Sequence, residues 1–162
     1  MILQAVSDVL NADLALSGVV HPEQSLNWHG TLERATLTMR EQQWLLDTPT
    51  QLNYQAVKQE FFAAAHCWKQ GEASICFERP LLIGSKGDIS FDLQRFELGQ
   101  LQDLLPESSQ LYGEVNARGQ FSWSPSSSPS IHAVLETNPG SFEHRYEQNL
   151  KVGWQSVWAS IE

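Results

Sequence analysis

Apolar and polar residues alternate along most of this chain, with the period of two that is typical of half-buried β-strands. The clearest run lies in residues 88–93, where Ile89, Phe91 and Leu93 alternate with polar residues. Similar runs recur about every dozen residues, and clusters of Gly, Pro, Asn or Asp separate them. The pattern predicts an all-β protein of roughly ten short strands, antiparallel or mixed, arranged as a sandwich, a barrel or an open curved sheet.

Three segments depart from this alternation. Leu98, Leu101, Leu104 and Leu105 follow helical spacing before Pro106, which predicts one short amphipathic helix at about residues 97–105. Residues 124–130 contain only Ser and Pro, and we expect a mobile loop there. Residues 55–69 fit both helical and strand spacing, so both structures are open for this segment. The propensity of residues 63–65, all alanine, favours a helix, whereas the hairpin described next favours a strand from Ala63 onward.

The two cysteines lie in a segment with the form of a β-hairpin. If Gly71 and Glu72 make a two-residue type II′ turn, Trp68 faces Ile75 and Cys67 faces Cys76 on a non-hydrogen-bonded rung. Cα atoms on such a rung are about 4.5 Å apart, which is within the range of a disulfide. We therefore expect a cross-strand disulfide, which implies an oxidising compartment. Two unrelated buried thiols are the alternative.

The phase of the hairpin separates two faces. The cysteine side also carries Lys69, Ser74 and Glu78, so we expect it to face outward. The other side carries Trp68 and Ile75, so we expect it to face inward.

Composition restricts the function further. The chain has 162 residues, with ten basic residues against nineteen acidic residues and a net charge of −9. This balance argues against nucleic acid as a partner, because that binding depends on neutralising phosphates. No apolar run reaches the roughly 20 residues of a membrane span. The disulfide and the interrupted strand patterns at both ends suggest that residues 1–162 are one segment excised from a longer exported protein.

No motif for catalysis or for a cofactor is present in the sequence. The five histidines (His21, His29, His66, His132 and His144) do not occur in a spacing typical of zinc ligands, and a second Cys or His pair is lacking. There is no P-loop, nucleophile elbow or dinucleotide fingerprint. We expect a protein that is not an enzyme and that needs no metal or other cofactor.

Several phrases of the sequence resemble the TamB family, the inner-membrane-anchored subunits of the translocation and assembly module, which are AsmA-like. The most specific block contains Ala65, His66, Cys67, Trp68, Gly71, Cys76, Pro80, Gly84 and Gly87. The resemblance continues through residues 87–93, 96–98, Leu101, 104–106, 111–113 and 121–123, and residues 16–19, Pro22 and 30–32 are similar to the family's repeated strand phrase. It covers residues 12–123.

This resemblance implies an open β-sheet curled into a long trough, a β-taco, with an apolar interior. It also implies a periplasmic protein anchored in the inner membrane by an N-terminal helix that this chain lacks, and a partner, the outer-membrane barrel TamA, that binds regions absent here. The chain would be an internal section of the trough, conducting phospholipids between the inner and outer membranes. The alternative is a chaperone-like module that assists the assembly of outer-membrane β-barrel proteins.

The strand phases give a set of candidate residues for the apolar lining of such a groove. Each could instead be ordinary core, and the helix could plug the trough or pack outside it. The candidates are Leu14, Leu16, Leu37, Leu52, Tyr54, Phe62, Trp68, Ile75, Phe77, Ile89, Phe91, Leu93, Leu111, Val115, Phe121 and Trp123.

Overall fold

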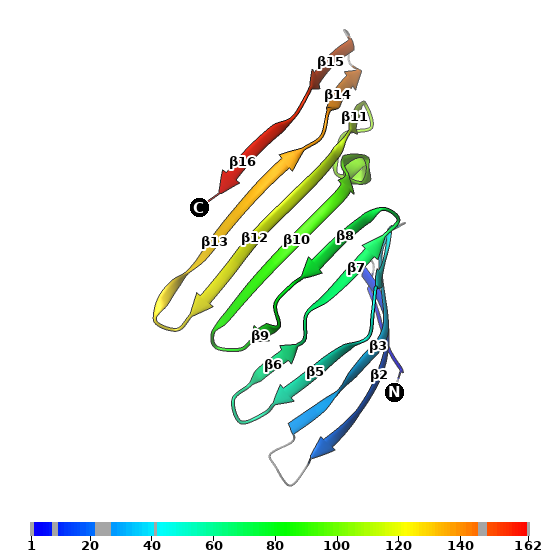
Figure 1. Ribbon diagram of the computed structural model, residues 1–162. Helices are drawn as coiled ribbons and strands as arrows, with labels where there is room; N and C mark the ends of the chain where they lie inside the picture. Colours follow the sequence, from blue (N-terminus) through cyan, green and yellow to red (C-terminus); the bar gives the residue numbers. More distant parts are fainter. Residues whose placement is uncertain (1, 8–9, 22–26, 41, 146–148, 162) are drawn as a thin grey trace.

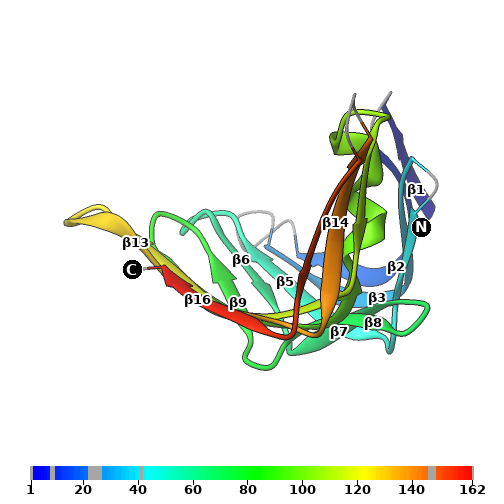
Figure 2. The same cartoon turned by 90° about the horizontal axis from the view of Figure 1, so that it is seen from above.

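The protein is an open, curved, all-β structure, as the sequence predicted. The computed structural model describes residues 2–7, 10–21, 27–40, 42–145 and 149–161. Within these residues a thirteen-stranded sheet and a three-stranded sheet account for all sixteen strands, and the pairings between these strands are antiparallel. Figure 1 shows the strands side by side without closure into a barrel, and Figure 2 shows how strongly they bend.

The main sheet follows the order β16-β13-β12-β10-β8-β7-β4-β3-β5-β6-β9, with β2 and β1 added beside β3, and the small sheet follows the order β11-β14-β15. The strands are β1 (Ile2–Val6), β2 (Leu10–His21), β3 (Asn27–Met39), β4 (Gln42–Leu46), β5 (Thr50–Gln55), β6 (Glu60–Ala63), β7 (His66–Gln70), β8 (Ala73–Phe77), β9 (Leu81–Ile83), β10 (Gly87–Glu97), β11 (Ser109–Tyr112), β12 (Glu114–Ser124), β13 (Ser127–Thr137), β14 (Gly140–Arg145), β15 (Asn149–Trp154) and β16 (Val157–Ile161).

The described part of the chain has more strands than the roughly ten expected, because six long runs are each interrupted once. Residues 47–49, 64–65 and 78–80 separate β4 from β5, β6 from β7 and β8 from β9, and the register places these breaks beside one another. Pro49 and Pro80 lie in two of them, where the missing N–H cannot join a ladder. At the third, Thr50 donates its hydroxyl to the Ala64 carbonyl at 3.2 Å. The sheet therefore bends along one line.

A second line of breaks separates the small sheet from the main sheet. Residue 113, residues 138–139 and residues 155–156 interrupt the runs β11–β12, β13–β14 and β15–β16. Gly113 has φ +123°, and a Cβ there would lie 3.1 Å from the Gly140 Cα. Only glycine adopts this conformation without strain, so its position fixes the corner.

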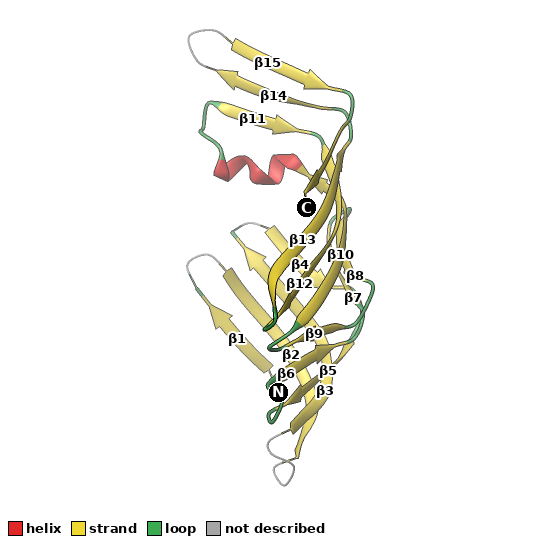
Figure 3. Ribbon diagram, turned by 90° about the vertical axis from the view of Figure 1, so that its left-hand side faces the viewer, coloured by secondary structure: helices red, strands yellow, loops and turns green. Residues whose placement is uncertain are grey.

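The predicted helix is present as the 3₁₀ helix η2 (Leu98–Leu104), and it lies side by side with the strands. Figure 3 shows it between β11 and β4. On one side the Leu98 amide donates to the Gly113 carbonyl at 2.8 Å, and Gln102 donates to the Ser109 carbonyl. On the other side Gln42 Nε2 donates to the Gln100 carbonyl at 2.7 Å, and Arg40 pairs with Asp103 at 3.1 Å. The helix thus bridges the two sheets beyond the tip of the β7–β8 hairpin.

Two other segments are more regular than the sequence suggested. Residues 55–69 contain β6 and β7 and no helix among their described residues. The expected Ser/Pro loop at 124–130 is reduced to a turn at residues 125–126, because residues 127–130 continue β13. Ser122 faces Ser130 and Ser124 faces Ser127. Pro129 is tolerated because β16 joins β13 only from Ala133 onward, which leaves that edge unpaired at residue 129.

Candidate functional site

The register of the β7–β8 hairpin defines two faces of the main sheet. Cys67 lies opposite Cys76 and Trp68 opposite Ile75, as predicted, and the two cysteines form a disulfide with Cα atoms 4.0 Å apart. Gly71 has φ +55°, as a type II′ turn requires at its first central position. We call the side that carries Trp68 and Ile75 the apolar face, and the side that carries the disulfide the polar face.

The apolar face extends over the whole main sheet, because directly paired residues point to the same side. Ile75 lies opposite Leu93, and Leu93 lies opposite Ala117. Following the register in both directions places fourteen of the sixteen candidate residues on this face: Leu14, Leu16, Leu37, Leu52, Tyr54, Trp68, Ile75, Phe77, Ile89, Phe91, Leu93, Val115, Phe121 and Trp123.

Two candidate residues lie elsewhere. Phe62 is paired with Asn53 and Leu82 on the polar face. Alternation counted back from Trp68 predicts that Phe62 points inward. The break at residues 64–65 shifts the alternation, so Phe61 is the residue that points to the apolar face. Leu111 belongs to β11 in the small sheet, where it lies opposite Phe142, because the corner at Gly113 ends the main sheet.

Charge is separated between the two faces at the paired positions of the described main sheet. Every Asp, Glu, Lys and Arg at a paired position points to the polar face, and none points to the apolar face. These residues are Asp13, Arg34, Glu60, Lys69, Asp88, Asp92, Glu97, Glu114, Arg118 and Glu136. The apolar face is therefore an uncharged surface that crosses from β2 to β16.

The apolar face lies on the inside of the bend. Trp44 on β4 stacks with Phe96 on β10, with ring centroids 6.5 Å apart, although β7 and β8 lie between these strands in the sheet order. In a flat sheet three strand spacings would separate β4 from β10 by about 14 Å. The stacked pair, together with the contact between Gln42 and η2, shows that the sheet curls toward its apolar side.

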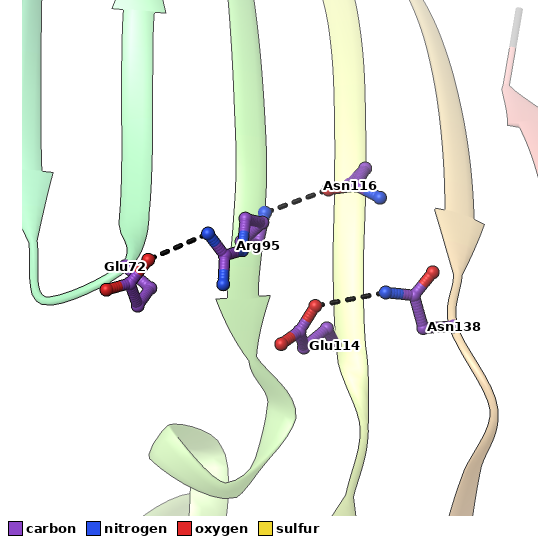
Figure 4. Close-up of polar contacts among 5 residues, drawn as sticks. All are labelled: Glu72, Arg95, Glu114, Asn116 and Asn138. Carbon is purple, nitrogen blue, oxygen red and sulfur yellow. Dashed lines mark hydrogen bonds and ion pairs between the residues drawn. The ribbon is translucent and has the colours of Figure 1, made fainter.

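A bulge in β10 keeps Phe96 on the apolar face. The register shifts between Leu93 and Phe96, and Arg95 in the bulge has φ +54°. Its amide donates to Asn116 Oδ1 at 2.8 Å, and its guanidinium pairs with Glu72 at 2.7 Å (Figure 4). The extra residue resets the alternation, so that Phe96 points to the same side as Leu93.

No second layer of structure covers most of the apolar face. All seven buried hydrophobic residues among those described point to this side, but only two of them, Leu32 and Leu81, are large. The other five are Ala35, Ala63, Ala73, Val115 and Ala117. Most of the larger side chains are only partly buried, and Tyr54 and Phe121 are 39% and 37% exposed. A closed sandwich would bury such residues against a second sheet.

Several residues of the apolar face were absent from the candidate set. Trp28, Trp44, Phe61 and Phe96 all point to it. Alternation could have found Trp28, which shares its phase with Gly30, but bulges and breaks hide the phase of Phe61 and Phe96.

The buried polar contact between Ser109 and His144 has a structural explanation. Ser109 is 2% exposed and its hydroxyl lies 2.8 Å from His144 Nδ1, which joins β11 to β14. Within the described residues there is no group of three or more His, Cys, Asp or Glu that could hold a metal ion. No described helix is long and apolar enough to cross a membrane.

Comparison with known proteins adds a family. All of residues 1–162 match the model described as "TamB, N-terminal domain". The chain is 22% identical over 148 residues to the translocation and assembly module subunit TamB of Haemophilus influenzae. That match covers 91% of this chain and 11% of the relative. No solved structure matches the chain significantly.

Proposed function

Because this chain belongs to the TamB family, we propose that it forms one section of a bridge along which phospholipids pass between the inner and outer membranes. The phospholipid acyl chains would lie against the apolar face, and the headgroups would stay in water beyond it. The observation that carries this proposal is the absence of charge from a large, uncovered, inward-curving face.

The physical chemistry of this face suits acyl chains. Each CH₂ group removed from water contributes about 0.8 kcal/mol, so an acyl chain is retained without a polar contact. No Lys or Arg at the paired positions of the described main sheet points to the face, so none of them holds a phosphate at a fixed place. A chain in contact with similar apolar neighbours at successive positions can slide between them.

The proposal extends to location and partners. The Cys67–Cys76 disulfide suits the oxidising periplasm. Anchoring in the inner membrane and contact with TamA would belong to other parts of the full-length protein, since this chain spans only 11% of its relative from Haemophilus influenzae. The role of this section would be to continue the apolar path.

Photocrosslinking at neighbouring positions on opposite faces tests the conduit. Leu93 points to the apolar face, and the next residue, Gln94, points to the polar face opposite Ser74. A photoreactive residue at position 93 of the full-length protein should give phospholipid adducts in cells, and the same residue at position 94 should give few. Equal yields at both positions, or no phospholipid adduct at position 93, would contradict the proposal.

A chaperone-like role is the second candidate, and the exposed outer strands favour it. Trp158 on β16 is 76% exposed, and among the described strands β16 pairs only with β13. Unpaired strand edges can accept a strand from another polypeptide. A photoreactive residue at position 158 that captures unfolded barrel proteins, together with no lipid adduct at position 93, would favour this role over the conduit.

A further inference from the structure

Aromatic rings on the apolar face lie directly over glycines of neighbouring strands. A Cβ at Gly119 would be 2.8 Å from both Cε1 and Cζ of Phe91, the residue paired with it across β10 and β12. Trp123 lies in the same way over its partner Gly87. In both pairs the ring occupies the space where a side chain on the facing strand would begin.

The same arrangement recurs at the other end of the sheet. Trp28 covers two facing glycines, because Cβ atoms at Gly18 and Gly30 would lie 2.9 Å from its Nε1 and 2.7 Å from its Cζ2. Trp123 is also held down by a hydrogen bond of 3.0 Å from its Nε1 to the Gly84 carbonyl. Rings placed over strand glycines lie along the sheet instead of projecting from it.

This geometry gives the glycines a role that their conformational freedom does not explain. Gly87 and Gly119 are not among the residues with positive φ, so their backbone dihedral angles do not require glycine. Their missing side chains instead leave room for the rings of Trp123 and Phe91. A Cβ at Gly87 or Gly119 would overlap the ring, and it would also lie 2.8 Å from the Leu82 carbonyl or 2.9 Å from the His132 carbonyl. Either the ring moves toward the space inside the bend or the facing backbone shifts.

We propose that Gly87 and Gly119 are positioning residues. By letting the rings of Trp123 and Phe91 lie along the sheet, they set how much space is open above the apolar face, and so determine how bulky an acyl chain can pass. This inference rests on the proposed conduit function. With the rings flat, the face is smooth at Phe91 and Trp123. With a ring raised, a straight saturated chain still passes, whereas a chain with a bulky substituent is excluded.

The test compares two lipids on variants of the full-length protein. A photoreactive residue at position 93 would report the adduct yields of dipalmitoyl phosphatidylethanolamine and of a phosphatidylethanolamine with a pyrene-labelled chain, both supplied in vesicles. Gly119→Ala should lower the pyrene-lipid yield about tenfold relative to the dipalmitoyl yield, a range in which pockets discriminate small differences in apolar bulk. Gly153→Ala is the matched control, because its Cβ would meet only the Gly140 carbonyl at 3.6 Å.

A double variant separates ring displacement from distortion of the backbone. A Cβ at Gly119 would also be 2.9 Å from the His132 carbonyl, and this contact persists when the ring is removed. Phe91→Leu lacks the ring atoms Cε1 and Cζ, so the pair Gly119→Ala and Phe91→Leu should restore the unsubstituted ratio of the two yields.

Three outcomes would overturn the inference. An unchanged ratio in Gly119→Ala would show that the ring does not set the width. A reduced ratio that Phe91→Leu fails to restore would assign the effect to the backbone. If neither lipid crosslinks at position 93 in otherwise unsubstituted protein, the proposed conduit itself fails, and the inference fails with it.

Discussion

Cys67 and Cys76 lie opposite each other on the polar face of the β7–β8 hairpin, joined by a disulfide, with Trp68 and Ile75 as the next pair on the apolar face. The disulfide therefore fixes the register of the hairpin without contacting the apolar face. It closes a short loop, with a sequence separation of 9 residues. In the chain-entropy model such a loop contributes about 2–3 kcal/mol of stability.

Replacement of both cysteines by serine should loosen this hairpin locally. We expect the opening free energy of the amides in residues 66–77 to fall by about 2–3 kcal/mol, measured by hydrogen exchange. The phospholipid adduct yield at position 93 should change little, because the apolar face keeps its residues. Unchanged exchange in residues 66–77, or loss of the adducts, would contradict this assignment of roles.

The Lys151–Glu143 pair in the small sheet gives a prediction about pH. The hydrogen bond from Lys151 to Glu143, 2.6 Å long, and the Glu143 charge raise the pKa of Lys151 above its ordinary value of 10.5. The folded state therefore favours the protonated lysine. The contribution of the pair to stability is complete below pH 10.5 and is lost as the pH rises through the raised pKa.

Substitution of the carboxylate tests this relationship. Glu143→Gln should lower the pKa of Lys151 toward 10.5, followed by NMR titration of the lysine side chain. Asp47→Asn, which removes the partner of Lys69, should leave the Lys151 titration unchanged. A Lys151 pKa that is the same in Glu143→Gln as in the unsubstituted protein would show that the two side chains do not pair in solution.

The sequence predicts residues on uninterrupted strands well and residues beyond a break poorly. The hairpin register follows from counting outward from the Gly71 turn, and the alternation of Ile89, Phe91 and Leu93 survives because β10 is continuous there. The phase of Phe62 is wrong because residues 64–65, both alanine, interrupt the run without a Gly or Pro to mark the break.

The bulge at Arg95 is a second feature that local pattern does not reveal. Its conformation depends on Asn116 and Glu72, residues that lie 21 and 23 positions away. The contact of Phe96 with Trp44 depends in turn on this bulge and on the curl of four strands. Features of this kind are set by tertiary contacts, whereas the general division into an apolar and a polar side is set by alternation.

Asn116 should contribute more to the bulge than Glu72 does. Asn116→Ala removes the acceptor of the Arg95 amide and should cost about 1 kcal/mol in the opening free energy of the β10–β12 amides near the corner. Glu72→Gln, the control, removes an ion pair whose Arg95 and Glu72 side chains are 54% and 74% exposed, so it should cost less than about 0.5 kcal/mol. Hydrogen exchange measures both, and equal costs would show that the ion pair supports the bulge as strongly as the amide contact.

A charge on the apolar face should block the conduit while the fold persists. Leu93→Arg places a guanidinium among Ile75, Ala117 and Phe91, where an acyl chain in contact would have to desolvate it. Since Leu93 is only partly buried, the Arg side chain can still reach water in the protein without lipid, and the circular dichroism spectrum should keep its β form.

Gln94→Arg, on the polar face of the same strand, is the matched control and should leave lipid transfer unchanged. We expect Leu93→Arg to lower the transfer of labelled phospholipid between donor and acceptor vesicles by about 5- to 150-fold, since an uncompensated polar contact costs roughly 1–3 kcal/mol. Equal transfer by the two variants would show that acyl chains do not cross the apolar face at β10.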